Sequence, residues 1–166
     1  MVQCVDCGRE VGRDEAHIID GETVCLRCLH GDAEPVVIYP IGVVHNDKTR
    51  RPDGFGTSGG DVSEIRLYCG QKRFLKGLAD ESKLTVVWQL HRRQDIRSEF
   101  HRGWDGKHVG VFASRTPDRV TPIAVTDVDL LEVRDDTLVV RGLDAIDGTP
   151  VLDIKVAPAS LRQTPR

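Results

Sequence analysis

The sequence contains no long hydrophobic run and no recognisable export signal. No stretch of about 18 apolar residues occurs, which excludes an ordinary membrane-spanning helix. The first residues lack both the basic start and the apolar segment of a secretory signal. We therefore expect a soluble, cytoplasmic protein with no membrane partner.

The chain also lacks internal repeats and a composition typical of disorder. Of its 166 residues, 39% are hydrophobic and 30% are charged, which suits one medium-sized core with a small appendage. Residues 1–35 hold three basic and eight acidic side chains, whereas residues 45–119 hold fifteen basic and ten acidic ones. Because phosphate contacts need clustered lysine and arginine, the acidic first segment does not favour a nucleic-acid-binding finger. The positive middle of the chain remains available to an anionic partner.

Four of the five cysteines form two Cys-x-x-Cys pairs separated by 17 residues, a spacing typical of a structural zinc site: Cys4, Cys7, Cys25 and Cys28. In a reducing compartment this pattern favours metal ligation over disulfides. Four sulfur ligands leave no open coordination position, so the metal would stabilise the module and take no part in catalysis. Substitution of a ligand by His17 or His30, unligated cysteines and disulfide-based redox sensing are the alternatives.

After a polar linker at residues 31–35, the pattern becomes β-rich. We expect an exposed loop at 47–61, one short helix at 72–80, and strands at 36–44 (bulged at Pro40 and Gly42), 65–68, 84–90, 109–113, 123–133, 138–142 and 151–156. Few helices and frequent turns predict a mainly β fold, a small barrel or rolled sheet. The expected organisation is a zinc ribbon or knuckle module at 1–34, a β-barrel domain at 36–158 and a tail at 159–166.

Two turn-rich segments carry more polar chemistry than plain turns require. Residues 110–124 hold two arginines, two prolines and three hydroxyl groups, and proline fixes such a loop before a ligand arrives. Residues 143–155 place three carboxylates around an Asp-Gly-Thr-Pro turn. Taken separately, each segment is equally compatible with a solvated turn between strands.

Together the two segments resemble the TsaA-like family, which includes the TrmO-type (YaeB-type) tRNA methyltransferases that act on threonylcarbamoyladenosine beside the anticodon. The resemblance spans residues 39–158, and the matching residues are Pro40–Val44, Trp88–His91, Gly110–Pro117, Asp144 and Asp147–Lys155. It implies a small β-barrel, usually a homodimer, that binds S-adenosylmethionine without a doubly wound sheet. It also implies a methyltransferase acting on tRNA or a related acceptor.

The resemblance further implies a set of site residues. Those expected to bind S-adenosylmethionine are Phe112, Ser114, Arg115, Arg119, Thr121, Asp144, Asp147, Gly148, Thr149, Pro150 and Lys155. Arginine suits a bidentate grip on a carboxylate or phosphate. Asp153 and His91 are the candidate catalytic bases. The simpler alternatives are a surface ion pair between Asp153 and Lys155, and a hydrogen-bonded, partly buried His91.

The chain departs from the family pattern at Val120-Thr121, where the family has Pro-Asn, and at Val156-Ala157, where it has Pro-Tyr. Threonine imitates only part of the donor and acceptor set of asparagine. An alternative function is therefore a non-catalytic S-adenosylmethionine sensor whose zinc module docks a protein partner. The basic and aromatic residues of 91–108 fit either an RNA contact or an ordinary charged loop.

Overall fold

The computed structural model describes residues 1–49, 60–92 and 95–158, and the chain divides into two compact units. The first unit consists of Met1–Val37 and Arg92–Pro122, and the second of Ile38–His91 and Ile123–Arg166. Within the described residues, no helix is long and apolar enough to cross a membrane.

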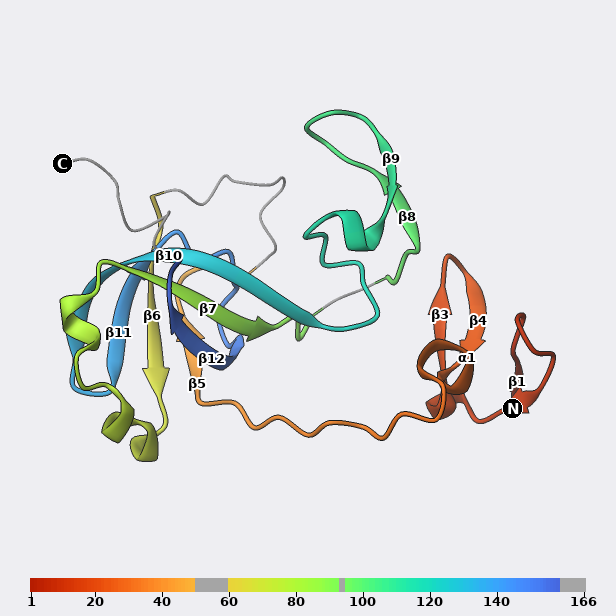
Figure 1. Ribbon diagram of the computed structural model, residues 1–166, viewed down its shortest axis with the longest axis horizontal. Helices are drawn as coiled ribbons and strands as arrows, with labels where there is room; N and C mark the ends of the chain where they lie inside the picture. Colours follow the sequence, from red (N-terminus) through yellow and green to blue (C-terminus); the bar gives the residue numbers. More distant parts are fainter. Residues whose placement is uncertain (50–59, 93–94, 159–166) are drawn as a thin grey trace. The chain divides into compact units, whose positions relative to one another are not determined.

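The second unit is built on a closed antiparallel barrel, visible in Figure 1. Its strand order is β10-β11-β6-β5-β12-β7, with β5 at Gly42–His45, β6 at Val62–Leu67, β7 at Lys83–Gln89, β10 at Ile123–Arg134, β11 at Thr137–Arg141 and β12 at Pro150–Val156. Closure leaves the barrel sheet no unpaired edge. The prediction of a mainly β fold with a small barrel is confirmed.

The alternation of buried and partly exposed residues is clearest in β7 of the barrel. In β7, Leu84, Val86 and Trp88 are buried while the residues between them are partly exposed. Because successive side chains of a strand point to opposite faces, this pattern directs one face inward. The inward residues of β5, β6, β10, β11 and β12 complete a single apolar cluster.

Two backbone features shape the barrel near the predicted motifs. At Gly42 a Cβ atom would lie 2.4 Å from the carbonyl oxygen of Arg66, so no larger residue fits between β5 and β6. In β12 the register against β7 shifts between Val151 and Asp153. The Asp153 carboxylate accepts the backbone N–H of Ile154 at 2.8 Å beside this bulge.

The first unit contains short two-stranded sheets and one α-helix among its described residues. Its elements are β1 at Val2–Gln3, β2 at Glu10–Val11, β3 at Ala16–Ile19, β4 at Glu22–Cys25, α1 at Leu26–His30, β8 at Glu99–His101 and β9 at His108–Gly110. β1 pairs with β2, β3 with β4, and β8 with β9. Short 3-10 turns complete the secondary structure at Arg13–Glu15 and Val111–Ala113 here, and at Cys69–Phe74 and Leu78–Asp80 in the barrel unit.

Three predicted elements were wrong in extent or type. The strand predicted at 36–44 begins only at Gly42, and residues 36–39 form no strand and are exposed. The apolar run suggested a strand, but Pro40 cannot donate to a ladder. The helix predicted at 72–80 is replaced by two 3-10 turns, interrupted at Gly77 with φ +81°. The strand predicted at 109–113 ends at Gly110 and continues as a 3-10 turn.

Other predicted boundaries stay predictions. Much of the loop expected at 47–61 and all of the tail at 159–166 lie outside the described residues. The predicted division of the chain into a module at 1–34 and a barrel domain at 36–158 also remains an expectation.

Candidate functional site

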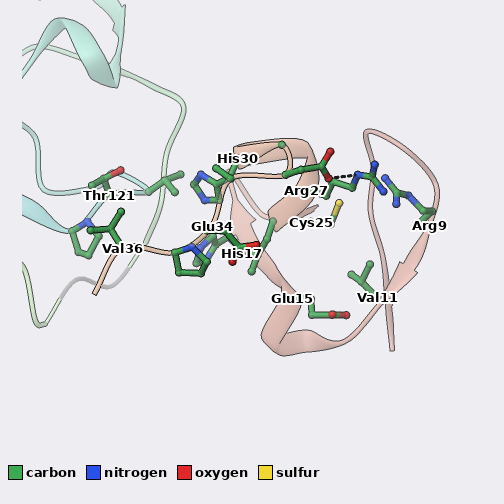
Figure 2. A pocket seen from close by; sticks show the side chains of 17 residues that line it. Arg9, Val11, Glu15, His17, Cys25, Arg27, His30, Glu34, Val36 and Thr121 are labelled. Carbon is green, nitrogen blue, oxygen red and sulfur yellow. Dashed lines mark ion pairs between the residues drawn. The ribbon is translucent and has the colours of Figure 1, made fainter. Parts of the chain in front are cut away.

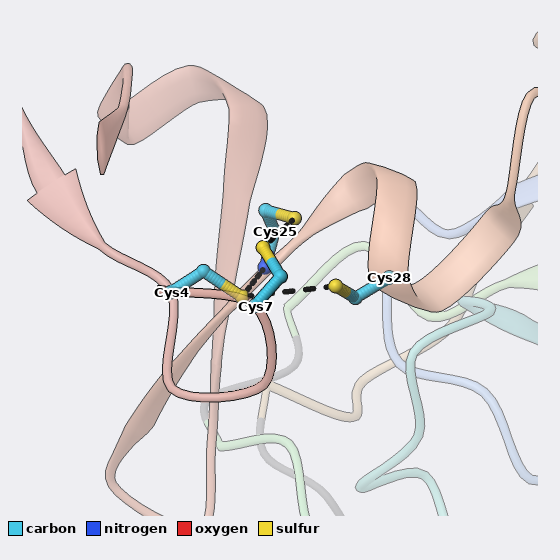
Figure 3. A group of neighbouring side chains, drawn as sticks. All are labelled: Cys4, Cys7, Cys25 and Cys28. Carbon is cyan, nitrogen blue, oxygen red and sulfur yellow. Dashed lines mark hydrogen bonds between the residues drawn. The ribbon is translucent and has the colours of Figure 1, made fainter. Parts of the chain in front are cut away.

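The four paired cysteines converge in one cluster, and Figure 3 shows their side chains pointing toward one another. Cys4 and Cys7 lie on a tight turn in which the Gly8 N–H donates to the Cys4 carbonyl. Cys25 ends β4, and Cys28 lies in the short helix α1. The sulfur atoms all lie within 4.8 Å of one another. Neither His17 nor His30 belongs to this group of possible ligands.

The spacing of the sulfurs fits a tetrahedral metal ion. Cys4 Sγ lies 3.9 Å from Cys28 Sγ, and Cys7 Sγ lies 3.9 Å from Cys25 Sγ. A zinc–sulfur bond of about 2.3 Å in tetrahedral geometry separates the sulfurs by about 3.8 Å. The cluster therefore has the dimensions that a four-thiolate zinc site requires.

The electrostatics of the cluster also suit a cation. The backbone N–H of Cys25 lowers the pKa of the Cys4 thiol to about 6. The neighbouring sulfurs of Cys25 and Cys7 raise the pKa of Cys28 to about 12. Without a cation, repulsion keeps the four thiols from ionising together, and a bound divalent ion would remove that repulsion.

The arginine loop, residues 111–119, is held by one of its own arginines. The Arg119 guanidinium donates to the carbonyl oxygens of Thr116 at 2.8 Å, Ser114 at 2.7 Å and Val111 at 3.3 Å. The Ser114 hydroxyl donates to the same Val111 carbonyl at 2.9 Å and accepts the Thr116 N–H. Arg119 and Ser114, both predicted cofactor residues, thus fix the shape of this loop.

Phe112 and Arg115 are the large exposed side chains of this loop. Phe112 is 90% exposed. Arg115 is exposed as well, and within the described parts of the chain no hydrogen bond or ion pair engages its guanidinium. The loop therefore presents two groups to a ligand: the apolar ring of Phe112 and the guanidinium of Arg115, which can donate two parallel hydrogen bonds.

The 143–149 loop of the second unit is anchored on the residues that follow β5. The Asn46 side chain donates to the Ala145 carbonyl at 2.9 Å and to the Ser63 hydroxyl at 3.0 Å. The Asn46 backbone N–H donates to Oδ1 of Asp147 at 3.2 Å. Lys48 adds a contact from its ammonium to the Leu143 carbonyl at 3.1 Å. Asn46 and Lys48 were not singled out from the sequence, because their partners lie about a hundred positions away.

Several predicted residues of the second unit form side-chain contacts with one another or with a neighbouring residue. Thr149 Oγ1 lies 3.3 Å from His91 Nδ1. Asp147 Oδ1 lies 3.6 Å from His45 Nδ1, another residue that the sequence did not single out. Asp153 and Lys155 form a surface ion pair, as the simpler alternative expected.

The remaining predicted positions of the second unit are Asp144, Gly148 and Pro150. Asp144 is half-buried, Gly148 takes φ +75° in the turn, and Pro150 opens β12. The predicted site residues thus fall into two sets. Of the predicted cofactor and catalytic residues, those in the first unit are Phe112, Ser114, Arg115, Arg119 and Thr121, and the others lie in the second unit.

An open groove of about 910 Å³ lies within the first unit (Figure 2). The four-cysteine module and the linker supply most of its lining, including Arg9, His17 and His30. Thr121 lines it as well, and no other predicted cofactor residue is part of the described lining. The groove is therefore distinct from the surface that Arg115 and Phe112 present.

The family model of the tRNA-methyltransferase O N-terminal domain matches residues 41–159. The chain belongs to this family. The resemblance to TrmO-type proteins is thereby confirmed. The match begins at Ile41, so the four-cysteine module lies outside the TrmO domain.

Two relatives align with about seven tenths of this chain. A "Probable S-adenosyl-L-methionine-binding protein" of Methanothermobacter thermautotrophicus is 37% identical over 121 residues, covering 71% of this chain and 87% of the relative. An "S-adenosyl-L-methionine-binding protein" of Archaeoglobus fulgidus is 32% identical over 126 residues, covering 72% and 88%. The mouse tRNA (adenine(37)-N6)-methyltransferase is 33% identical over 92 residues, which cover 54% of this chain and 21% of the mouse protein.

The fold is that of a solved TrmO structure. The crystal structure of TrmO from Pseudomonas aeruginosa aligns with a TM-score of 0.62 and 23% sequence identity over 80% of this chain. This chain spans 60% of the length of that TrmO chain.

Proposed function

We propose that this protein binds S-adenosylmethionine and transfers its methyl group to tRNA, with threonylcarbamoyladenosine or a related modified adenosine as acceptor. The observation that carries the proposal is Arg115, an exposed and uncommitted guanidinium on a loop stiffened by Arg119, within a domain of the TrmO family. Relatives named for S-adenosylmethionine binding support the cofactor. The mouse and human tRNA (adenine(37)-N6)-methyltransferases support the substrate class.

The donor set of the chain suits the parts of this cofactor. Arg115 would grip the carboxylate of its amino-acid end through two parallel hydrogen bonds. Phe112, with its ring exposed, would contact the adenine. Asp147, in the second unit, keeps a half-exposed side chain although its Oδ1 already accepts the Asn46 N–H, so its second oxygen can accept a further hydrogen bond. Of the other predicted cofactor residues, Gly148 and Thr149 would keep Asp147 in its turn.

When bound, S-adenosylmethionine supplies a methyl group that an acceptor nitrogen attacks as the carbon–sulfur bond breaks and its electron pair neutralises the sulfonium. Alignment of the reacting groups contributes most of the catalysis in such a displacement. The proton that leaves the acceptor nitrogen needs a base within hydrogen-bond reach. His91, whose ring is oriented by Thr149, is our candidate. Asp153, which forms an ion pair with Lys155, is the second candidate.

The cysteine cluster would hold one zinc ion with a structural role. Four thiolates fill its coordination shell and leave no position for substrate. The homodimer and the cytoplasmic location that the sequence suggested remain predictions.

The test is incubation of the zinc-loaded protein and methyl-labelled S-adenosylmethionine with total tRNA and, separately, with total cellular protein. We expect label in tRNA, and nucleoside analysis should assign it to a threonylcarbamoyl-modified adenosine. Arg115→Ala should abolish the labelling of tRNA. The control is Lys76→Ala, which also removes one positive charge but lies outside the proposed site, and it should leave the labelling unchanged. Label confined to protein would exclude the tRNA acceptor.

One observation favours a second function, a non-catalytic S-adenosylmethionine sensor. Val120 and Thr121 replace the family's Pro-Asn, and Thr121 lines the groove beside the metal-binding module. In this case the cofactor binds, no cellular RNA is methylated, and a protein partner binds in a manner that requires Cys4 and Cys28. Absence of label from tRNA, with cofactor binding intact, is the result that would favour this function.

A further inference from the structure

We propose that the metal-binding module positions the arginine loop through Asp20, so that metal occupancy controls how well this loop is ordered for its ligand. The ligand part of this inference rests on the proposed function, but the coupling itself does not. It assigns a role to a module that lies outside the family domain.

Asp20 stands at the tip of the hairpin formed by β3 and β4. Asp20 and Gly21 both take positive φ values, 52° and 85°, as a two-residue hairpin turn requires. Aspartate tolerates this conformation better than most residues. The turn therefore directs a carboxylate away from the hairpin.

The tip of the hairpin contacts residues 96–98 through both its backbone and its side chain. The Asp20 N–H donates to the Ile96 carbonyl at 3.1 Å, and Ile19 forms a parallel β-bridge with Ile96. The Asp20 carboxylate accepts the backbone N–H of Ser98 at 3.0 Å and its hydroxyl at 2.5 Å. The Ser98 hydroxyl and N–H also lower the pKa of Asp20, as expected of donors that stabilise the carboxylate.

The same short segment holds the arginine loop near both of its ends. The Ser98 carbonyl accepts the N–H of Val111 at 2.9 Å. The Arg97 N–H donates to the Asp118 carbonyl at 3.0 Å. Release of residues 96–98 from Asp20 would therefore loosen the backbone on which Arg115 stands.

The hairpin in turn depends on the cysteine cluster. The Val5 N–H donates to the Thr23 carbonyl of β4 at 2.9 Å, and the Cys25 N–H donates to Cys4 Sγ at 3.3 Å. Among residues 1–34, the buried apolar residues are Cys4, Val24 and Cys25. A module with so small a core relies on its metal for folding free energy. Loss of the metal should therefore disorder the hairpin and free Asp20 from Ser98.

The experiment measures hydrogen exchange of the Ser98, Arg97 and Val111 amides in the full chain, with zinc bound and after chelation. Asp20→Gly keeps the turn, because glycine takes a positive φ, and removes the carboxylate. Loss of charge-assisted hydrogen bonds of this kind corresponds to a change of about tenfold or more in the opening equilibrium of the segment, and therefore in its rate of hydrogen exchange. We expect exchange at the Ser98 and Val111 amides to rise by about that factor in Asp20→Gly and in the chelated protein, and the Val87 amide of the barrel to stay unchanged.

Two further variants separate positioning from general destabilisation. Asp20→Asn restores an acceptor oxygen in the same turn and should recover part of the protection. Asp135→Gly is the matched control, because Asp135 takes φ 51° in the β10–β11 hairpin of the barrel. It should not change exchange at Ser98 or Val111. Unchanged exchange at these amides in Asp20→Gly or after chelation would overturn the inference.

Ligand binding is measured on the same samples. We expect the affinity for S-adenosylmethionine to fall severalfold in Asp20→Gly while the zinc content stays at one per chain. If the unmodified protein binds no S-adenosylmethionine, the proposed function fails, but the exchange data still decide the coupling. If the protein binds the cofactor and the exchange does not respond, only the coupling fails.

Discussion

Thr149 Oγ1 lies 3.3 Å from Nδ1 of His91, which precedes it by 58 positions. Thr149 is completely buried just before β12, and His91 follows β7, which pairs with β12. The contact orients an imidazole that the sequence marked as a candidate base. It therefore joins two residues that were predicted separately.

A double-mutant cycle should detect this contact. Thr149→Val keeps the volume and removes the hydroxyl, and we expect the free energy of unfolding to fall by about 1 kcal/mol in urea denaturation. In a His91→Phe background the same change should cost less, because the partner is already gone. Equal costs in both backgrounds would mean that the two side chains do not interact.

Arg115 and Arg119 should respond in different ways to replacement by alanine. Arg119→Ala removes a donor from three backbone carbonyls, of which only that of Val111 also accepts the Ser114 hydroxyl, so we expect a loss of about 1–3 kcal/mol of stability. Arg119→Lys should not restore it, since one ammonium lacks the planar geometry of the guanidinium. Arg115→Ala should leave the unfolding midpoint within error and weaken S-adenosylmethionine binding at least tenfold. Thermal unfolding and calorimetry check both statements, and a stability loss at Arg115 would contradict the assignment.

Asn46 should prove a structural residue and Asp147 a ligand residue. Asn46 bridges the Ser63 hydroxyl and the Ala145 carbonyl, and Ser63 is buried, so Asn46→Ala should cost about 2 kcal/mol. Asp147→Asn keeps an oxygen for the Asn46 N–H and should unfold like the unmodified protein. Its cofactor affinity should nevertheless fall, because the charge is lost. Equal affinity in Asp147→Asn would remove Asp147 from the proposed site.

Metal content should depend on the clustered cysteines alone. Elemental analysis of the purified protein should give one zinc per chain, and replacement of Cys4, Cys7, Cys25 or Cys28 by serine should lower it. Cys69→Ser is the control, because Cys69 is exposed and lies outside the cluster. Zinc-free protein as purified, with disulfides between the pairs, would instead support redox sensing.

Local sequence patterns predicted the parts of the structure that depend on neighbouring residues. The spacing of Cys4, Cys7, Cys25 and Cys28 was enough to predict the cluster. Short runs of apolar and β-branched residues located the strands around Trp88 and Leu138. The run at 36–39 misled because it is as apolar as a strand but remains exposed.

Contacts between distant residues could not be predicted in this way. Asn46 contacts Ala145 across 99 positions, and Asp20 contacts Ser98 across 78. Neither pair has a local signature, because each side chain would also suit an ordinary turn. The opposite roles of Arg115 and Arg119 likewise depend on loop geometry, which their identical side chains do not reveal.

Titration calorimetry of the zinc-loaded protein with S-adenosylmethionine tests the central claim most directly. We predict saturable binding of one cofactor per chain in the unmodified protein, and strongly reduced binding in Arg115→Ala at unchanged stability. Absence of detectable heat at cofactor concentrations well above the protein concentration, confirmed by equilibrium dialysis with labelled cofactor, would contradict it.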